Sequence, residues 1–545
     1  MMEETNNKET TKTRSKGKRR QAKGGAYKRN SARKDYKCKT ETNLSDNPRN
    51  DANWYTSGPN GSIPFNVPFS DRLGTEVDLT PKGNQISGFT MSGTRSAFPG
   101  VAVIPVGPTI GQATAKVDPI NIAVYKLHAA LRYGQAYSHT YDATALAYHL
   151  IMADSAMMLM EFWRRIYGML RYYSADNGYM PEYILRAIGV DASTFLGSNY
   201  DAVREYINHM ADALSIVKVP KTWTYFRRHQ YLMSTIYADS QTTKAQFYAF
   251  TPAYLYRYTI TSTSAYLEPV PFFDLQTPWT FDTLKSFTNE IIDSLIGEDD
   301  VSIIAADILR LYGAEGTYKW EHIDANYSVV PMYDTNVLLQ IHNARFIPGV
   351  FGALADSERA NFRITQNTST GAITFIPHYN VVGTLSSNVG HVGNGFSALI
   401  DVAGFNPTPE MVAEASRLLF SSALTYHPAS GSTNPSLDVT PYNVASEICF
   451  EPFAWYFTPS GAFSYLGRGS QSVSNLSVWD KFNFAPLYTI PTIVNDDSVE
   501  NPRIIGLIDN YAVADSTLIS RMNLNALLSM MQVPILEEVK VNVGK

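Results

Sequence analysis

Residues 141–174 read YDATALAYHLIMADSAMMLMEFWRRIYGMLRYYS, and this stretch decides the fold. Before Trp163 its only formally charged side chains are Asp142, Asp154 and Glu161. At about 100° per residue, Asp154, Glu161 and Arg165 share one narrow stripe, on which Glu161 can pair with Arg165 one turn later. A helix that is apolar around most of its girth is buried on most sides, so we predict a central helix about 50 Å long.

Three residues refine this prediction. Asp142 can cap the first turn of the helix, and Gly168 can bend or end it. Leu159 lies about 140° round the helix from Asp154 and should therefore face the core. Because Asp154 and Glu161 would sit in hydrocarbon, the stretch is too interrupted for a membrane span, and we expect no stable membrane insertion.

The charge of the 545-residue chain is divided unevenly. Residues 1–39 hold 14 Lys/Arg against 4 Asp/Glu, a net of +10, and the whole chain carries −5, so residues 40–545 carry −15. A basic arm on an acidic body suits a protein that binds a polyanion with one end only. The two cysteines, Cys38 and Cys449, cannot form a disulfide framework, and no secretory signal precedes them.

Residues 1–53 are predicted to be a disordered basic arm, because they are rich in Lys, Arg, Asn, Thr and Ser. Its cations can neutralise phosphates without reading sequence, and Tyr27 and Tyr36 can stack on bases. A solubilising or nuclear-targeting tail is the alternative, which the KGKRR at 16–20 would also satisfy. The candidate nucleic-acid-binding residues are Lys12, Arg14, Lys16, Lys18, Arg19, Arg20, Lys23, Lys28, Arg29, Arg33, Lys34, Lys37 and Lys39.

Two regions of different character follow the arm. Residues 54–117 are punctuated by Pro, Gly and Ser and are expected to lie extended over a surface, with a short strand near 101–106. Residues 118–244 are helical, with Asp118 and Pro119 opening the first helix. Further helices are expected at 181–188, from Asn199, and at 221–237.

Beyond residue 245 the pattern favours strands. Alternation at 254–259 predicts a strand, and the turn-rich NTSTG at 367–371 predicts a hairpin. Helices interrupt this region at 280–295, at 300–312 and after Thr408, and a last helix should begin at Asp515.

The sequence offers no catalytic constellation. It lacks the phosphate-loop, zinc-protease and nucleophile-elbow motifs, and its ten histidines show no metal-ligand spacing. His149, on the apolar helix, is better explained as a hydrogen-bonded core histidine than as a base. We therefore expect a non-enzymatic protein with no cofactor and no metal site.

Three pieces of the chain resemble the capsid proteins of picobirnaviruses, which are small double-stranded RNA viruses. They are AFPGVAVIPVGPTIG (97–111), RRIYGMLRYYSADNGYMPEYILRAIGVD (164–191) and VPKTWTYFRRHQYLMSTIYADSQTTKAQFYAFTP (219–252), in this order. The resemblance implies symmetric dimers that assemble into a small icosahedral shell, a place in the virion, and assembly in the host-cell cytoplasm. It also implies packaging of RNA by the arm, and N-terminal processing for which the bonds after Asn60 and Asn66 are candidates.

The expected fold class is α+β and helix-rich. The resemblance assigns 118–244 to a helical shell domain, to which 510–545 return, and 245–509 to a strand-rich projecting domain with a few helices. The alternative from another class is a non-viral nucleic-acid-binding protein, with a basic tail and a globular body that binds a partner. A third alternative is an enzyme of unrecognised type that its tail anchors to RNA.

Overall fold

The fold is α+β and helix-rich, as the sequence predicts. In this computed structural model the chain divides into two compact units, Met1–Asp71 with Ser240–Ala245, and Arg72–Asp239 with Gln246–Lys545. All the elements named below belong to the second unit. The structure describes residues 76–78, 95–97, 100–133, 140–172, 180–196, 199–240, 245–262, 264–347, 349–382, 398–427, 430, 436–457, 463–468, 478–479, 482–494, 498–505, 508 and 510–531.

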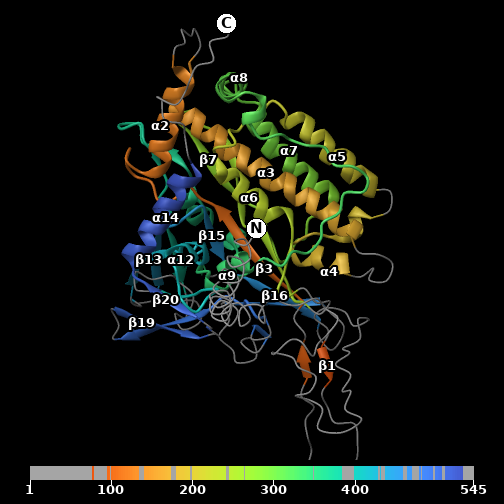
Figure 1. Ribbon diagram of the computed structural model, residues 1–545, viewed down its shortest axis with the longest axis vertical. Coiled ribbons are helices and arrows are strands. Elements are labelled where there is room, and N and C mark those ends of the chain that lie inside the picture. The colour runs from red at the N-terminus through yellow and green to blue at the C-terminus, as the bar shows by residue number, and fades with distance from the viewer. Residues whose placement is uncertain are drawn as a thin grey trace, which may run out of the picture. The chain divides into compact units, whose positions relative to one another are not determined.

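The predicted central helix is present as α3 (Ala143–Tyr172), which is 30 residues long (Figure 1). The Ala145 N–H donates to the Asp142 carboxylate over 2.7 Å, which confirms the expected cap. Gly168 does not end the helix. The absence of a side chain at Gly168 lets the backbone at Val329 lie close to the helix, because a Cβ there would lie 2.7 Å from the backbone nitrogen of Val329.

The charged stripe of α3 is buried with the rest of the helix. Glu161 pairs with Arg164 over 2.6 Å, three residues on, and not with Arg165 as expected. Arg165 turns away and donates to the Thr235 carbonyl over 3.3 Å. Leu159 is fully buried, as predicted. Among the described helices, α3 alone has the length and hydropathy of a membrane span, and 94% of that window is buried inside the protein.

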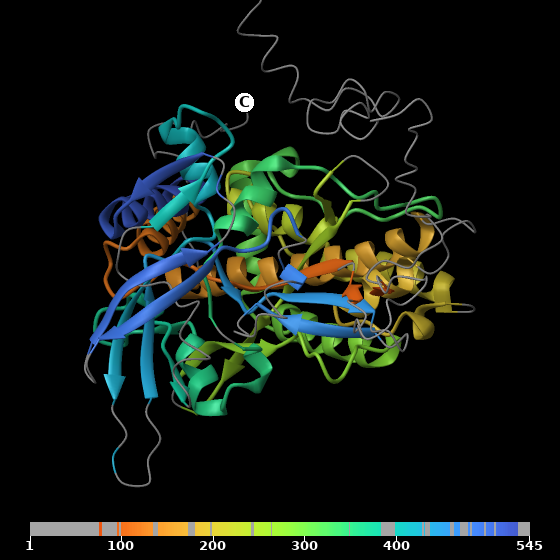
Figure 2. The same cartoon turned by 90° about the horizontal axis from the view of Figure 1, so that it is seen from below.

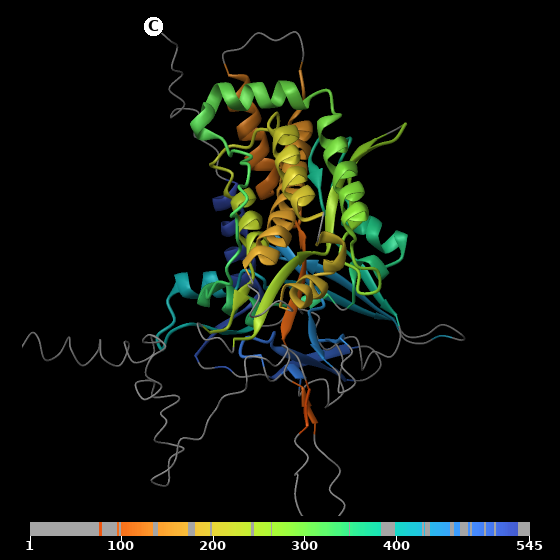
Figure 3. The ribbon, with the colours of Figure 1, turned by 90° about the vertical axis from the view of Figure 1, so that its right-hand side faces the viewer.

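Other helices pack around α3 (Figure 1). Most run beside it, whereas α8 crosses one end of the group (Figure 3). Their buried residues recur at three- and four-residue steps, as Val203, Ile207, Met210 and Leu214 do on α5, so burial of one face explains their positions. The helices are α2 (Pro119–Arg132), α4 (Met180–Ala187), α5 (Asn199–Leu214), α6 (Thr224–Ser234), α7 (Phe281–Ile296) and α8 (Val301–Tyr312).

Two helix ends differ from their sequence-based description. The Asp118 carboxylate precedes α2 but accepts from the N–H groups of Thr114 and Ala115, so it orders the entering turn and not the first helical turn. The helix expected at 221–237 ends at Ser234, because Tyr237–Ala238 pairs as strand β4 with its neighbour in a sheet.

One seven-stranded sheet has β3 (Val101–Pro108) at its centre. On one side β3 pairs in parallel with β5 (Phe247–Pro252), and on the other it pairs antiparallel with β15 (Glu447–Phe450) and then β16 (Phe453–Phe457). Figure 2 shows β3 beside the blue strands β16 and β17. The sheet is completed by β4 (Tyr237–Ala238), β8 (Phe346–Ile347) and β17 (Phe463–Gly467).

All eight residues of β3 are buried, so this part of 54–117 does not lie on a surface as expected. A run of Val, Ala and Ile without polar alternation is typical of a strand covered on both faces. The pairing of β3 with β5 also crosses the boundary expected at residue 245, since Val101 lies opposite Phe247.

The predicted strand at 254–259 and the predicted hairpin at 367–371 are both confirmed, each within an antiparallel pair. Strands β6 (Tyr254–Ile260) and β7 (Ala265–Pro271) pair antiparallel, and so do β9 (Thr365–Gln366) and β10 (Ile373–Thr374) around the NTSTG turn.

A second, smaller core contains Ile400, Ala415, Leu419, Ala514 and Ile519. It is built from β12 (Ala398–Asp401), β20 (Tyr511–Ala514), α9 (Thr335–Asn343), α12 (Pro409–Ala415) and α14 (Ser516–Met530). The helices after Thr408 and Asp515 are as predicted, but α9 was not predicted.

The remaining elements are short or form small sheets. They are β1 (Glu76–Asp78), β2 (Arg95–Ala97), β11 (Tyr379–Val382), β13 (Ser421–His427), β14 (Ser436–Tyr442), β18 (Tyr488–Val494), β19 (Ser498–Ile505), α10 (Asp356–Arg359) and the 3-10 turns η4 (Ala192–Phe195), η5 (Ala314–Gly316), η6 (Phe351–Ala353) and η7 (Ala360–Phe362).

Candidate functional site

The sequence-predicted site residues lie outside the described part of the chain. This holds for all the arm cations between Lys12 and Lys39, and for Asn60 and Asn66. The structure therefore neither brings these residues together nor separates them. The described residues offer two other features of functional interest, a buried ionic cluster and an exposed apolar surface.

The ionic cluster joins α3, α6 and β15 at the centre of the protein. Asp154 of α3 contacts His229 of α6, with 2.6 Å between Oδ2 and Nδ1. The other ring nitrogen, Nε2, lies 3.4 Å from Oε1 of Glu447 on β15. That same oxygen accepts from Arg228 Nε over 2.9 Å. Asp154, His229 and Glu447 have no exposed side-chain surface, and Arg228 is 13% exposed.

Burial and mutual attraction set the protonation of this cluster. Burial alone would lower the pKa of His229, but Asp154 and Glu447 outweigh it and raise that pKa to about 9. Burial would raise the pKa of Glu447, yet Arg228 and His229 hold it well below its ordinary value. Burial raises the pKa of Asp154, against the attraction of His229. At neutral pH the imidazole is therefore protonated and shared between two acidic residues.

The cluster resembles a catalytic arrangement only in its residue types. A base must reach a substrate, and neither ring nitrogen of His229 reaches solvent. Arg417 also contributes attraction to Glu447 from within the protein. The geometry serves to hold a helix of the central layer and a strand of the sheet against α3.

Sequence reasoning did not find this cluster. Arg228 and His229 stand in the quoted segment 219–252, but Glu447 lies 219 residues beyond Arg228. The one local signal is an acid on an otherwise apolar helix, Asp154, because a buried charge needs a partner. That signal predicts that a partner exists without naming it.

Within the described residues, no group of three or more His, Cys, Asp and Glu side chains is placed to hold a metal ion. Cys449 is a buried free cysteine on β15, and burial raises its pKa, which keeps the thiol protonated and unreactive.

Exposed apolar side chains gather on two elements of the second core. Leu518, Leu524 and Leu528 are exposed on α14, and Tyr511 and Val513 are exposed on β20. Figure 1 shows these two elements close to each other in the chain's second unit. Large apolar surfaces left in solvent are typical of protein contact sites, and Tyr is enriched at such sites.

The comparisons with known proteins agree with the resemblance of the three sequence segments. Residues 54–457 match the family described as picobirnavirus capsid protein. A capsid protein precursor of human picobirnavirus (strain Human/Thailand/Hy005102/-) is 26% identical over an alignment of 412 residues, and the match covers 73% of this chain and 73% of the relative. The X-ray crystallographic structure of the picobirnavirus capsid is similar with a TM-score of 0.72 at 20% identity, over 91% of this chain and 100% of that chain.

Proposed function

Since the chain belongs to the picobirnavirus capsid protein family and is a structural protein of the virion, we propose that it self-assembles as symmetric dimers into a small icosahedral shell. The shell forms in the host-cell cytoplasm and packages double-stranded RNA. Family membership carries this proposal and removes the non-viral alternative. A structural role also accounts for the ionic cluster, which braces the interior and is closed to substrates.

The RNA is bound by the basic arm. The support is the charge distribution, because +10 lies in residues 1–39 and −15 in the rest of the chain. Double-stranded RNA offers a protein mainly its phosphates and its shape, and Lys and Arg neutralise phosphates without regard to sequence. The acidic body would repel RNA, so the contact is confined to the arm.

Deleting residues 1–39 tests this. We expect shells that still form but contain little RNA, and a salt dependence of RNA binding that nearly disappears. The matched control deletes 40–53, which carries three acidic residues and one arginine and so removes no basic excess. Shells of the 1–39 deletion with a normal ratio of absorbance at 260 nm to 280 nm would refute the role of the arm.

The dimer is the building block, with a self-complementary interface in which one patch meets its own copy. An interface that survives handling should bury more than roughly 2,000 Å² and be more apolar than the remaining surface. The exposed side chains of α14 and β20 support the proposal, because they supply apolar surface for such contacts. Native mass spectrometry across a pH series should show shells that release dimers before monomers. Direct release of monomers would refute the dimer as the unit.

The helices of 118–244 form the shell domain, 510–545 return to it, and α7 and α8, which pack on α3 from residues 281–312, stay with it. The projecting domain lies within 245–509. The pairing of β5, β15 and β16 with β3 supports keeping these strands with the shell domain in this proposal. The small sheet β11–β14–β13 and the pair β18–β19 are then the parts of 245–509 that project. When intact shells are treated with a protease, the first cleavages should occur in the loops that connect these strands.

A further inference from the structure

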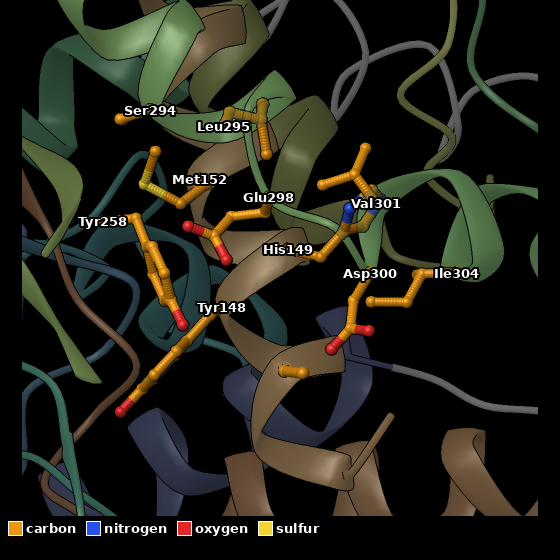
Figure 4. A pocket seen from close by; sticks show the side chains of 11 residues that line it. Tyr148, His149, Met152, Tyr258, Ser294, Leu295, Glu298, Asp300, Val301 and Ile304 are labelled. Carbon is orange, nitrogen blue, oxygen red and sulfur yellow. The ribbon is translucent and has the colours of Figure 1, made fainter. Parts of the chain in front are cut away.

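The first turns of α3 and the junction between α7 and α8 line a small pocket (Figure 4). Two of its polar side chains are already engaged within the chain. Glu298 accepts a hydrogen bond from Tyr258, and Nε2 of His149 lies 3.0 Å from a backbone carbonyl oxygen. These contacts belong to the packing of the helical layer. Backbone that a partner can reach lies elsewhere, at one edge of the seven-stranded sheet.

Among the described residues, this sheet ends in three outer strands, β4, β8 and β17. Strands β4 and β8 are buried along their whole length, and the backbone of Met332 pairs with β4 from outside. All five residues of β17 are half-buried, and β16 is the one described strand that pairs with it. The outer edge of β17 therefore offers its backbone groups to a partner.

Strand β17 lacks the features that usually keep an edge strand from pairing. Its sequence, FSYLG, contains no charged residue and no proline, and its register with β16 runs without a bulge. By contrast, β7 carries Glu268 and Pro269, and β19 carries Glu500 and Pro502. A regular, uncharged edge readily accepts another strand.

The alternation of an antiparallel pair decides which backbone groups of β17 face outward. Directly after β17, the Arg468 N–H donates to the Pro452 carbonyl oxygen over 2.8 Å, in the same register that joins β17 to β16. Because every second residue turns its N–H and C=O groups to the same neighbour, the even-numbered residues of β17 face β16. The odd-numbered residues, with Tyr465 at the centre, direct their backbone groups away from β16.

We propose that β17 pairs antiparallel with β17 of a second copy of the chain, across a two-fold axis at Tyr465. The sheet then continues from one subunit into the next. This inference rests on the proposed symmetric dimer and names the place where its two copies meet. With the axis at Tyr465 all five residues of each strand have a partner, whereas any other register leaves part of the strand unpaired.

Two observations favour a second copy as the occupant of this edge. The chain belongs to a capsid protein family, so each subunit must meet other copies. Identical strands that pair antiparallel are related by a two-fold axis, which sets the residues of β17 beside those of its own copy. Charges of one sign would repel each other there, and β17 carries no charge.

The exposed apolar surface of α14 and β20 remains for contacts with further copies, because a closed shell needs more than one contact surface. In Figure 2 the dark blue helix α14 lies apart from the blue strands β16 and β17, as it does in Figure 1. The two surfaces therefore serve different neighbours.

Aromatic contacts hold the edge in place before it meets a partner. Phe463 stacks on Trp455 with 4.8 Å between ring centroids, and the Tyr465 ring lies 4.9 Å from the same indole. Gln276 donates to the Tyr465 hydroxyl over 3.2 Å. A strand that is already ordered loses little conformational entropy when it pairs.

The first experiment tests the register by disulfide formation in the full-length protein carrying Cys38→Ser, in which Cys449 stays buried. Tyr465→Cys sets two cysteines opposite each other with about 5.5 Å between their Cα atoms, which suits a disulfide. Mild oxidation should give a covalent dimer. Ser464→Cys is the matched control, because its two copies lie about 8 Å apart and should give little covalent dimer.

The second experiment uses the predicted neighbours, Ser464 of one copy and Leu466 of the other. Ser464→Lys with Leu466→Lys sets like charges opposite each other, whereas Ser464→Lys with Leu466→Glu sets a lysine opposite a glutamate twice. Both double variants replace the same side chains, so they differ in the sign of one charge. Analytical ultracentrifugation should show a dimer dissociation constant about tenfold higher for the lysine–lysine variant.

The outcomes separate this inference from the dimer itself. Dimers of the unaltered chain, together with no disulfide in Tyr465→Cys and equal dissociation constants of the two double variants, would overturn the strand pairing and leave the dimer intact. Equal disulfide yields in Tyr465→Cys and Ser464→Cys would overturn the register. Equally slow hydrogen exchange at Tyr465 in dimers and in monomers of the lysine–lysine variant would show that the edge is covered within one chain, which also overturns the inference. If the unaltered chain formed no dimers, both proposals would fail.

Discussion

Replacing Glu447 with glutamine removes the one negative charge between Arg228 and His229 and keeps the shape of the side chain. Oε1 of Glu447 lies 2.9 Å from Arg228 Nε and 3.4 Å from His229 Nε2, and the carboxylate has no exposed surface. Arg228 Nε and His229 Nε2 contact the same oxygen, so a glutamine oxygen can still face both donors, and its amide N–H₂ takes the place of Oε2, which has no hydrogen-bond partner among the described residues. The variant therefore changes mainly the charge. The variant leaves the protonated His229 with Asp154 and leaves the Arg228 guanidinium with the neutral side chain of Gln340 as acceptor.

The size of the effect follows from burial. Removing one member of a buried ion pair costs about 3–5 kcal/mol, because the other charge stays in a medium of low dielectric constant. An exposed pair contributes about 0–1 kcal/mol. Arg257 and Glu290, which are 34% and 52% exposed, form such a pair, and Glu290→Gln is the matched control. We expect Tm to fall by about 5 °C or more for Glu447→Gln and by less than about 2 °C for the control.

Differential scanning calorimetry of the unassembled protein at pH 6.5 measures both variants. A double-mutant cycle with His229→Gln separates the pair from its surroundings, and we expect a coupling above about 1 kcal/mol. If Glu447→Gln and Glu290→Gln had the same Tm, the cluster would contribute no more than an exposed pair. If the losses of unfolding free energy in Glu447→Gln and His229→Gln simply added in the double variant, the side chains would not form an ionic unit. The bracing role of the cluster would then be refuted.

Three further predictions concern the same interior. The pKa of His229 is raised from its ordinary 6.5 to about 9. Protonated His229 therefore contributes its full share to the free energy of unfolding below pH 6.5, and this share is lost as the pH rises through 9. Calorimetry should show a Tm that falls across this range, and that falls less in His229→Gln. Leu159→Asp places a charge at a fully buried site and should abolish soluble protein, whereas Leu159→Met should express normally; normal yield of the aspartate variant would contradict the central helix. Gly168→Ala sets a Cβ 2.7 Å from Val329 N and should lower Tm despite the better helix propensity of alanine; an unchanged or higher Tm would show that Val329 can move.

Local patterns were sufficient for the helical layer. The apolar stretch 141–174 predicted α3, because a helix that is apolar on all sides is buried in the protein core. The caps at Asp142, Thr408 and Asp515 were correct because a capping side chain acts on its own first turn. These features depend on residues a few positions apart, so the sequence contains all that determines them.

Features that depend on distant partners were not predictable in the same way. Arg164 and Arg165 are both within reach of Glu161, and tertiary contacts decide between them, since Thr235 accepts from Arg165. The placement of β3 was missed because its partners come from residues 247–252 and 447–457, and pairing across that separation leaves no local trace. The helix α9 was missed because its residues, TNVLLQIHN, are buried on nearly every side and show little polar alternation.

The ionic cluster combines features that depend on residues nearby in the sequence with features that depend on distant partners. Its members come from α3, which the local pattern predicts best, from α6, and from the strand β15, whose position depends on the fold as a whole. A charge on a buried helix is unfavourable alone, so Asp154 is tolerable only once His229 has arrived. Glu447 acts on His229, whose protonated form it stabilises from the other side of the ring. Correct packing of the helical layer on the sheet is thereby coupled to charge neutralisation. A subunit that has not completed its sheet would carry unpaired buried charges, which penalises partly folded copies before they can enter an assembly.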